Sequence, residues 1–163
     1  MARPLQHPKP KRIAVTPAVA AALAARAEQG LPHEVCGLLL GPARRTEGVV
    51  LVDELSESPN LAAAEGHDRF EIDPELHLRL RRELRGTGRT VLGLYHSHPN
   101  GTADASRADH MGGKLEPGLI WLIVPVVGGR AAHPAAYWAT ERGLVPVPLD
   151  YDATPSQQGD QQQ

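Results

Sequence analysis

Two histidines one residue apart, His96 and His98, begin the stretch of this chain that is best suited to chemistry. Side chains alternate along an extended strand, so both imidazoles point to one side and can bind the same metal ion. Pro99 has a fixed φ and no N–H to donate, and we expect the strand to end there. Ser106 and Asp109 lie three residues apart, on one face of a short helix that is predicted to begin at Ser106. The spacing gathers two ring nitrogens, a carboxylate and a hydroxyl around one point.

Two histidines and one carboxylate are a ligand set of catalytic zinc sites, in which the fourth position is left for water. Zinc lowers the pKa of that water from about 15.7 towards roughly 7, which makes a hydroxide-like nucleophile at neutral pH. The same triad also describes non-haem iron oxygenases, so chemistry with ferrous iron and oxygen is an alternative. A bare His-x-His also occurs as two solvated histidines in a loop. The residue types therefore predict a metal site, but they do not by themselves decide which reaction takes place there.

The whole pattern resembles the signature of the JAMM (MPN-plus) metallopeptidases. In this chain it reads His96-x-His98-Pro99, six residues, Ser106, two residues, Asp109. The resemblance implies a zinc peptidase or isopeptidase of the bacterial stand-alone type. It also implies an α/β fold with a mixed central sheet flanked by helices, related to the cytidine-deaminase fold. The His-x-Glu and Pro-Cys-x-x-Cys signature of the nucleic-acid deaminases themselves is absent.

Two segments upstream are also similar to that family. The stretch from His33 to Gly41 resembles its Glu-x-Cys-Gly-Leu-Leu-x-Gly segment, and the stretch from Arg69 to Pro74 resembles the middle segment of its bacterial members. The resemblance covers roughly residues 11–149. These residues are expected to form one metallopeptidase domain, between a flexible leader at 1–10 and a disordered polar tail at 150–163.

The resemblance assigns His96, His98 and Asp109 as the ligands of Zn²⁺. It implies that Ser106 donates a hydrogen bond to the oxyanion of the tetrahedral intermediate. Its capping of the helix that carries Asp109 is compatible with that role. Ser97 lies between the two histidines, points to the opposite side of the strand and is expected to be structural.

A metal-bound water needs a group that accepts its proton and later donates it to the leaving amine. Spacing alone does not choose between Glu34, Glu71 and Glu116. The resemblance selects Glu34, which would lie across the site as general base and acid.

The substrate that the resemblance implies is a ubiquitin-like or sulfur-carrier protein that is cut after its C-terminal Gly-Gly. Such an extended tail needs a narrow groove beside the metal, and Leu61–Phe70 and Asn100–Ala105 are the expected walls. The alternative is a non-catalytic scaffold of the MPN-minus type, which keeps the fold and loses the ligands. The presence of all five site residues argues against that alternative. A monomer and a homodimer both fit the sequence.

Cys36 is the basis of an alternative hypothesis, in which the protein is a cysteine peptidase that uses one of the histidines. It lies inside an apolar run, where a free cysteine is usually a small buried hydrophobic residue. His33, His67 and His110 are close to motif residues and are expected at the surface or in the substrate groove, not as a fourth ligand. Catalysis by Cys36 is therefore the weaker hypothesis.

Composition sets the remaining limits. With 163 residues, 41% of them apolar, and a formal net charge of -2, the chain fits one globular domain without a general attraction to nucleic acid or anionic membranes. A single cysteine excludes an internal disulfide and fits a reducing compartment. No apolar run approaches the length of a membrane span, and the leader lacks the apolar region of a signal peptide. The cytoplasm is the expected location.

Hydrophobic periodicity and turn residues predict the elements that must position the site. Thr16 followed by Pro17 is typical of a helix start, and Leu76, Leu80 and Leu84 form an apolar stripe at helical spacing. We expect strands at 12–15, 35–40, 49–52, 70–72, 91–95, 119–124, 135–139 and 144–147, helices at 17–29, at 75–85 and from 106, and a loop at 56–65.

Overall fold

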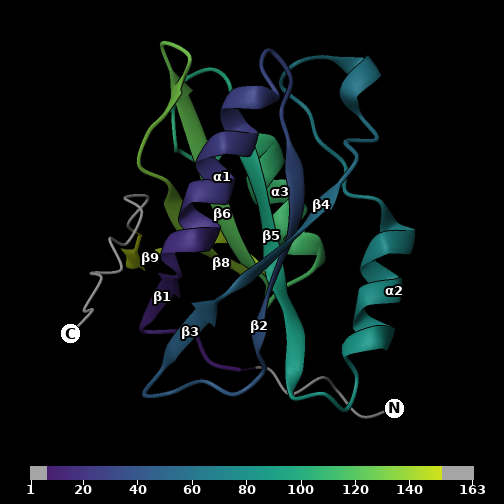
Figure 1. Ribbon diagram of the computed structural model, residues 1–163, viewed down its shortest axis with the longest axis vertical. Helices are drawn as coiled ribbons and strands as arrows, with labels where there is room; N and C mark the ends of the chain where they lie inside the picture. Colours follow the sequence, from purple (N-terminus) through teal and green to yellow (C-terminus); the bar gives the residue numbers. More distant parts are fainter. Residues whose placement is uncertain (1–6, 152–163) are drawn as a thin grey trace, which may run out of the picture.

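A mixed β-sheet forms the centre of the computed structural model, which describes residues 7–151 (Figure 1). The two central strands of this sheet run parallel and its other neighbours run antiparallel. Pro146 and Pro148 fall in or beside the edge strand, as predicted. In spatial order the strands are β4 (Glu54–Ser58), β2 (Cys36–Pro42), β5 (Arg89–His98), β6 (Ile120–Val127), β8 (Ala135–Thr140) and β9 (Gly143–Val147). The mixed α/β fold that the sequence predicts is thereby confirmed.

A second, all-parallel sheet has the order β10 (Leu149–Asp150), β1 (Arg12–Val15) and β3 (Val49–Val52). The short β10 was not predicted. The Tyr151 hydroxyl donates a hydrogen bond of 2.7 Å to the carbonyl oxygen of Ala20, so the packed chain extends past the expected boundary at 149. The rest of the predicted tail, and residues 1–6 of the predicted leader, lie outside the described residues.

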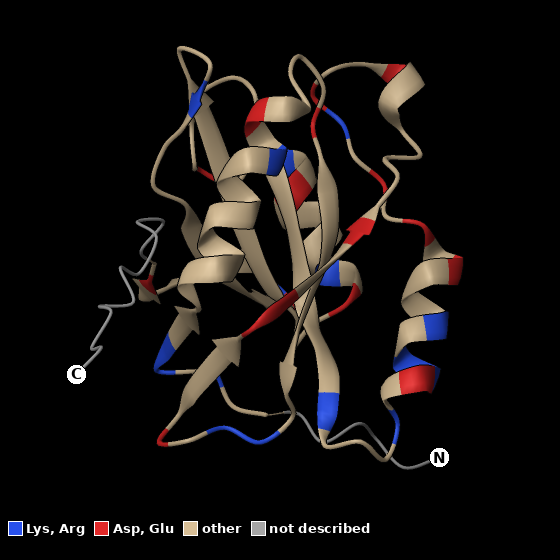
Figure 2. Cartoon of the chain, in the orientation of Figure 1, with Lys and Arg blue, Asp and Glu red and all other residues tan. Residues whose placement is uncertain are grey.

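Helices cover both faces of the central sheet. Helix α1 (Pro17–Gln29) lies on one face and is capped by Thr16, whose hydroxyl accepts from Val19 N. Helices α2 (Pro74–Leu84) and α3 (Arg107–Leu115) lie on the opposite face. The predicted leucine stripe of α2 packs against Leu38, Leu40 and Val91, and Figure 2 shows charged residues along the remainder of α2. No helix within residues 7–151 has both the length and the apolar character that crossing a membrane requires.

One extra residue in β5 decides which side chains face α2 and α3. Leu39 pairs with Gly93 and Leu40 pairs with Val91, so Leu92 is left unpaired as a β-bulge. Side chains alternate on either side of the bulge, but the bulge shifts the alternation by one residue. As a result Val91, which packs against α2, and His96 lie on the same face of the sheet.

Two predicted elements differ in the structure. The loop expected at 56–65 begins as strand β4, which pairs with β2 and is followed by a 3₁₀ turn at Ala63–Glu65. The strand expected at 70–72 is absent, and only Ile72 makes a single bridge, with Asn60. The reason is that the backbone around Phe70 bonds to a side chain and not to a neighbouring strand. The two-residue strand β7 (Arg130–Ala131), which pairs with β6, was also not predicted.

Candidate metal centre

The C-terminal end of β5 carries both histidines of the predicted site. His96 and His98 are 0% and 4% exposed, and their Nε2 atoms face each other at 3.0 Å. The strand can lie this close to β6 because of Gly93, where a Cβ atom would collide with the backbone of Ile120. Strand alternation therefore brings two imidazoles together in the interior, as the His-x-His spacing predicts.

Helix α3 places the predicted carboxylate beside them. Ser106 Oγ accepts from Asp109 N at 3.0 Å and Asp109 Oδ2 accepts from Ser106 N at 2.9 Å, which is a complete capping box. The Asp109 carboxylate also reaches both rings, with Oδ1 at 3.0 Å from His96 Nε2 and Oδ2 at 3.1 Å from His98 Nε2. Ser106 itself is exposed at the start of the helix.

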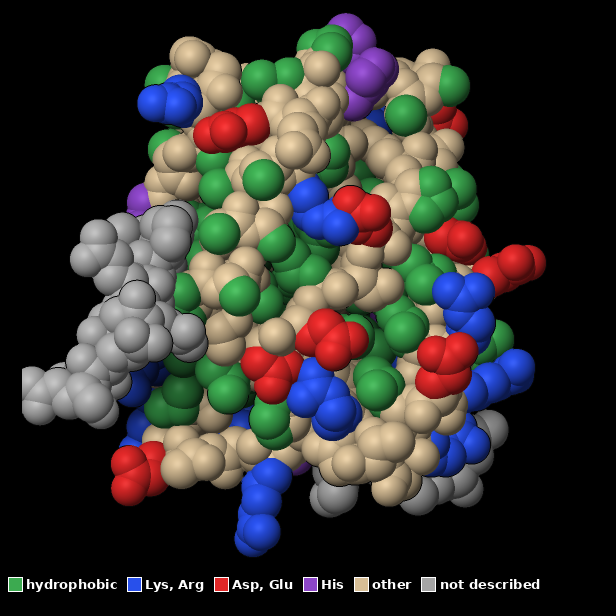
Figure 3. Space-filling view, viewed as in Figure 1, with side chains coloured by type: hydrophobic (Ala, Val, Ile, Leu, Met, Phe, Trp, Pro, Cys, Tyr) green, Lys and Arg blue, Asp and Glu red, His purple; other side chains and the backbone are tan. Residues whose placement is uncertain are grey.

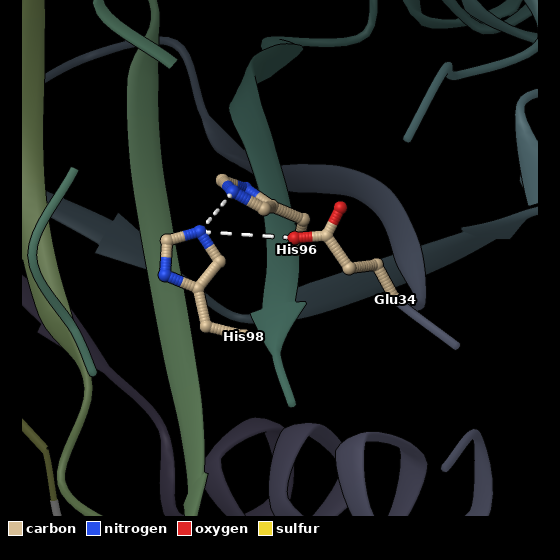
Figure 4. A group of neighbouring side chains, drawn as sticks. All are labelled: Glu34, His96 and His98. Atoms are coloured by element: carbon tan, nitrogen blue, oxygen red, sulfur yellow. Dashed lines mark hydrogen bonds and ion pairs between the residues drawn. The ribbon is translucent and has the colours of Figure 1, made fainter. Parts of the chain in front are cut away.

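Glu34 enters the site from the segment between α1 and β2 (Figure 4). The backbone of the next residue, Val35, is fixed by two hydrogen bonds to Ser97: Val35 N donates to Ser97 Oγ at 2.9 Å, and Ser97 N donates to Val35 O at 3.0 Å. This confirms a structural role for the Ser97 side chain. Glu34 is 5% exposed, its Oε1 lies 3.8 Å from His98 Nε2, and its Oε2 has no hydrogen-bond partner within residues 7–151.

The protonation of these groups suits a cation. His98 Nδ1 lies 2.9 Å from the carbonyl oxygen of Thr102, so it carries a proton and a neutral ring turns the lone pair of Nε2 towards the centre. Burial lowers the pKa of His96, which favours its neutral, metal-binding form. Burial alone would raise the pKa of Asp109, but the hydrogen bonds from His96 and His98 outweigh it and hold that pKa well below its usual range. Two ring nitrogens and a negatively charged carboxylate thus converge on one point.

The donor set fits a metal ion on these grounds. Glu34, His96 and His98 offer ligand atoms that all lie within 4.8 Å of one another, and all three side chains are buried. The contact of 3.1 Å between Asp109 Oδ2 and His98 Nε2 can be bridged either by a proton or by a metal ion that both atoms bind. The Glu-His-His group is therefore positioned to hold a metal ion.

Two aromatic side chains that the sequence analysis did not single out enclose the His96 ring. Phe70 stacks on it with a centroid distance of 4.1 Å and an interplanar angle of 18°. Trp121, on β6, stands edge to face with His96 at 5.7 Å and with Phe70 at 5.9 Å. Phe70 falls in the Arg69–Pro74 segment noted for its resemblance and at the end of the expected groove wall Leu61–Phe70, but neither signal indicates a contact with His96.

Asn60 is a second residue that the sequence analysis missed. Its Nδ2 donates to the carbonyl oxygens of Glu34 and Arg69, at 3.0 and 2.8 Å. Its Oδ1 accepts from the backbone N–H groups of Ala62 and Glu71, both at 3.0 Å. One amide side chain thereby connects the Glu34 backbone to both neighbours of Phe70. The contact spans 26 residues in sequence, and no local pattern reveals it.

Two pockets adjoin the centre and share no lining residue. One, of about 540 Å³, is lined by Glu34 together with Arg26 and Glu57, which form an ion pair. The other, of about 610 Å³, is lined by Asp109 and Trp121 and by Phe70 with its neighbours in the first predicted wall. Its opposite side is formed by α3, through Ala108 and Gly112, and not by the predicted second wall at Asn100–Ala105.

The remaining candidates lie apart from the donor set. The rings of His33 and His67 meet edge to face at 4.7 Å, and both residues are exposed, as predicted. His110 Nδ1 accepts from Leu144 N at 3.0 Å and so ties α3 to β9. Cys36 is buried among backbone carbonyls, and this burial raises its pKa to about 12. A thiol in this state is a poor nucleophile.

Comparison with known proteins places this geometry in a family. A desampylase from Haloferax volcanii is 31% identical over 104 residues, which cover 63% of this chain and 69% of that protein. A desampylase from Pyrococcus furiosus is 35% identical over 91 residues, which cover 56% of this chain and 59% of that protein.

Solved structures agree with the fold. A protein from Desulfitobacterium hafniense, 27% identical, superposes with a TM-score of 0.71 over 86% of this chain and 92% of that one. A JAB1/MPN domain protein from Archaeoglobus fulgidus, 19% identical, shares the fold with a TM-score of 0.53 over 88% of this chain and all of the other. The model of prokaryotic homologues of the JAB domain matches residues 16–140, which include every residue of the metal centre. The chain belongs to this family of prokaryotic JAB-domain homologues.

Proposed function

We propose that this protein is a zinc-dependent hydrolase that cuts a peptide or isopeptide bond after the C-terminal Gly-Gly of a ubiquitin-like or sulfur-carrier protein. The observation that carries the proposal is the meeting of two buried imidazoles and the Asp109 carboxylate, with a second buried carboxylate, Glu34, close by. The two relatives named desampylase support the same class of reaction.

His96, His98 and Asp109 would hold the zinc ion. The Asp109 carboxylate lies within 3.1 Å of both Nε2 atoms, whereas Glu34 Oε1 is 3.8 Å from the nearer one. This difference favours Asp109 as the third ligand and leaves Glu34 free for proton transfer. Zinc, when bound, supplies a Lewis acid that lowers the pKa of a coordinated water towards about 7.

Glu34 would accept the proton of the attacking water and deliver it to the leaving nitrogen. Burial raises the pKa of Glu34 to about 7, although nearby His98 opposes the shift. A carboxyl group with a pKa near neutrality can both take up and release a proton at physiological pH. Its Oε2, which has no partner within residues 7–151, is available for this exchange.

Ser106 would stabilise the oxyanion. Its Oγ already accepts a hydrogen bond from Asp109 N, which leaves the hydroxyl proton free to be donated. The side chain is exposed at the start of α3, where an incoming carbonyl group can approach it. The pocket between Phe70 and α3 would receive the extended tail that precedes the scissile bond.

The test is an intact-mass assay on a Gly-Gly-terminated sulfur-carrier protein that bears a short C-terminal extension. Zinc-loaded wild type is expected to release the extension. Glu34→Gln is expected to bind zinc as the wild type does but to lose at least about 100-fold in turnover, because the amide cannot carry the proton. Zinc content is measured in the same samples by mass spectrometry.

Glu116→Gln is the matched control, since Glu116 is an exposed carboxylate that spacing alone could not exclude and that lines neither of the two pockets. It is expected to retain full activity. Full activity of Glu34→Gln would show that another group moves the proton. A wild-type protein that binds no zinc and cleaves nothing would favour the non-catalytic scaffold.

A further inference from the structure

The two histidines of the metal centre are held in different ways. The His98 ring is fixed by the hydrogen bond between its Nδ1 and the carbonyl oxygen of Thr102. Metal-binding histidines nearly always hold their second ring nitrogen by such a bond, which orients the ring towards the ion. His96 Nδ1 is buried and has no hydrogen-bond partner among the described residues. When His96 Nε2 binds the metal ion, something other than a hydrogen bond from Nδ1 must orient the His96 ring.

We propose that Phe70 is a positioning residue for metal binding, because its ring, stacked on His96, takes the place of the missing hydrogen bond. The inference rests on the metal site of the proposed function. The near-parallel stack, at 4.1 Å and 18°, opposes rotation of the imidazole about its bond to the Cβ atom, since a rotated ring would collide with the Phe70 face. The two rings thus stay nearly parallel, and His96 Nε2 stays directed at the centre.

Trp121 closes the enclosure from the side of β6. It stands edge to face with both rings, at 88° to His96 and 77° to Phe70. Trp121 is itself fixed, because it is 5% exposed and Gly112 of α3 packs so closely that a Cβ atom there would lie 3.0 Å from its ring. The wall is therefore rigid on this side.

The loop that carries Phe70 is also fixed, in a way that points to positioning. Asn60 bonds to the carbonyl oxygen of Arg69 and to the N–H of Glu71, the two neighbours of Phe70. The same side chain bonds to the carbonyl oxygen of Glu34. Phe70 is thus held in a fixed position relative to the metal centre, although it belongs to a loop without regular secondary structure (Figure 1).

The experiment compares wild type with Phe70→Leu and Phe70→Tyr. Leucine keeps an apolar side chain but removes the flat face, whereas tyrosine keeps that face and can direct its hydroxyl into the adjoining pocket. Zinc affinity is measured by competition with a chelator, and the visible absorption of the Co²⁺-substituted protein reports ligand geometry. Loss of an orienting partner typically costs about 10- to 100-fold in metal affinity. We expect about a tenfold loss and an altered Co²⁺ spectrum for Phe70→Leu, and values near wild type for Phe70→Tyr.

Leu61→Ala is the control, since it removes an apolar side chain that is half exposed in the same loop. It is expected to leave both metal readouts unchanged. The unfolding of each metal-free variant is followed by circular dichroism, so that affinity is compared only between folded proteins. Unchanged zinc affinity in a folded Phe70→Leu variant would overturn the inference, as would an equal loss in Phe70→Tyr. Absence of zinc binding in the wild type would instead overturn the proposed function.

Discussion

Cys36 lies directly opposite His96 in the pairing of β2 with β5, yet its surroundings suit packing and not catalysis. Its Sγ is close to the carbonyl oxygens of Ser58, Pro59 and Glu71, at 3.8 to 3.9 Å. Carbonyl oxygens repel a thiolate, and burial raises the pKa of Cys36 to about 12. At neutral pH the residue is a protonated thiol. Cys36 and His96 therefore lie side by side in the sheet, but the surroundings of Cys36 do not suit a catalytic nucleophile.

Cys36→Ala is accordingly expected to keep its activity. The substitution removes one buried sulfur atom, so a modest loss of stability of about 1 kcal/mol is expected. Turnover of the Gly-Gly-terminated substrate is the measurement, and iodoacetamide labelling of the native wild type, followed by intact mass, is expected to be slow. Rapid labelling with complete loss of turnover would restore the cysteine-peptidase hypothesis.

At the scale of elements, the segment between β4 and α2 shows how an irregular chain can be held firmly. The Asn60 amide makes all four of its bonds to backbone groups, and these groups come from two segments on either side of the metal centre. Buried or half-buried backbone groups left without a partner are costly. The Asn60 side chain thus supplies hydrogen-bond partners to the backbone of this loop, as a neighbouring strand does in a sheet.

Asn60→Ala is expected to lower the free energy of unfolding by about 2 to 3 kcal/mol, since four hydrogen bonds are lost and water replaces only part of them. Urea unfolding of the metal-free protein is the measurement. Asn100→Ala is the matched control, because Asn100 accepts a single bond, from Thr102 N, and its loss should cost less than about 1 kcal/mol. Equal effects of the two substitutions would contradict the special role of Asn60.

At the scale of the whole molecule, buried groups that must stay protonated limit stability at alkaline pH. Burial raises the pKa of both Cys36 and Tyr95 to about 12, and these residues are 2% and 1% exposed. In the unfolded chain the same groups lose their protons near pH 9 and 10. Above those values the unfolded chain binds fewer protons than the folded one, so the free energy of unfolding falls as pH rises.

We therefore expect the free energy of unfolding to decrease steadily from about pH 9 to about pH 12, with a slope of up to about 1.4 kcal/mol per pH unit for each group. Urea unfolding at successive pH values measures it. Cys36→Ala removes the earlier of the two contributions, so its curve should be flatter between about pH 9 and 10. A wild-type curve without a decline over this range would show that the two groups ionise in the folded state.

The sequence sufficed for the parts of the site that follow from short-range geometry. The two periodicities, two residues in a strand and three to four in a helix, account for the meeting of His96, His98 and Asp109. The buried strands and the leucine stripe of α2 were predictable for the same reason. Strand β4 was not, because Leu55 is its one apolar residue and its pairing with β2 is made by backbone groups.

Contacts between distant segments escaped prediction. Phe70 reaches His96 from a loop 26 positions earlier in the chain, and Asn60 reaches Glu34 across another 26. Neither contact leaves a repeat, a spacing or a charge pattern behind it. Such contacts depend on how the loop is placed over the sheet, which only the folded chain defines.

The bulge at Leu92 has a consequence for how chains with this fold can change in length. Deletion of that single residue would restore unbroken pairing, and either Val91 would then turn away from α2 or the histidines would turn away from α3. Between Gly93 and His98 no single residue can be inserted or deleted, because successive side chains of a strand point to opposite faces. A one-residue change would turn a histidine away from the metal centre. Loops at the surface can change in length, whereas this part of β5 cannot gain or lose a single residue.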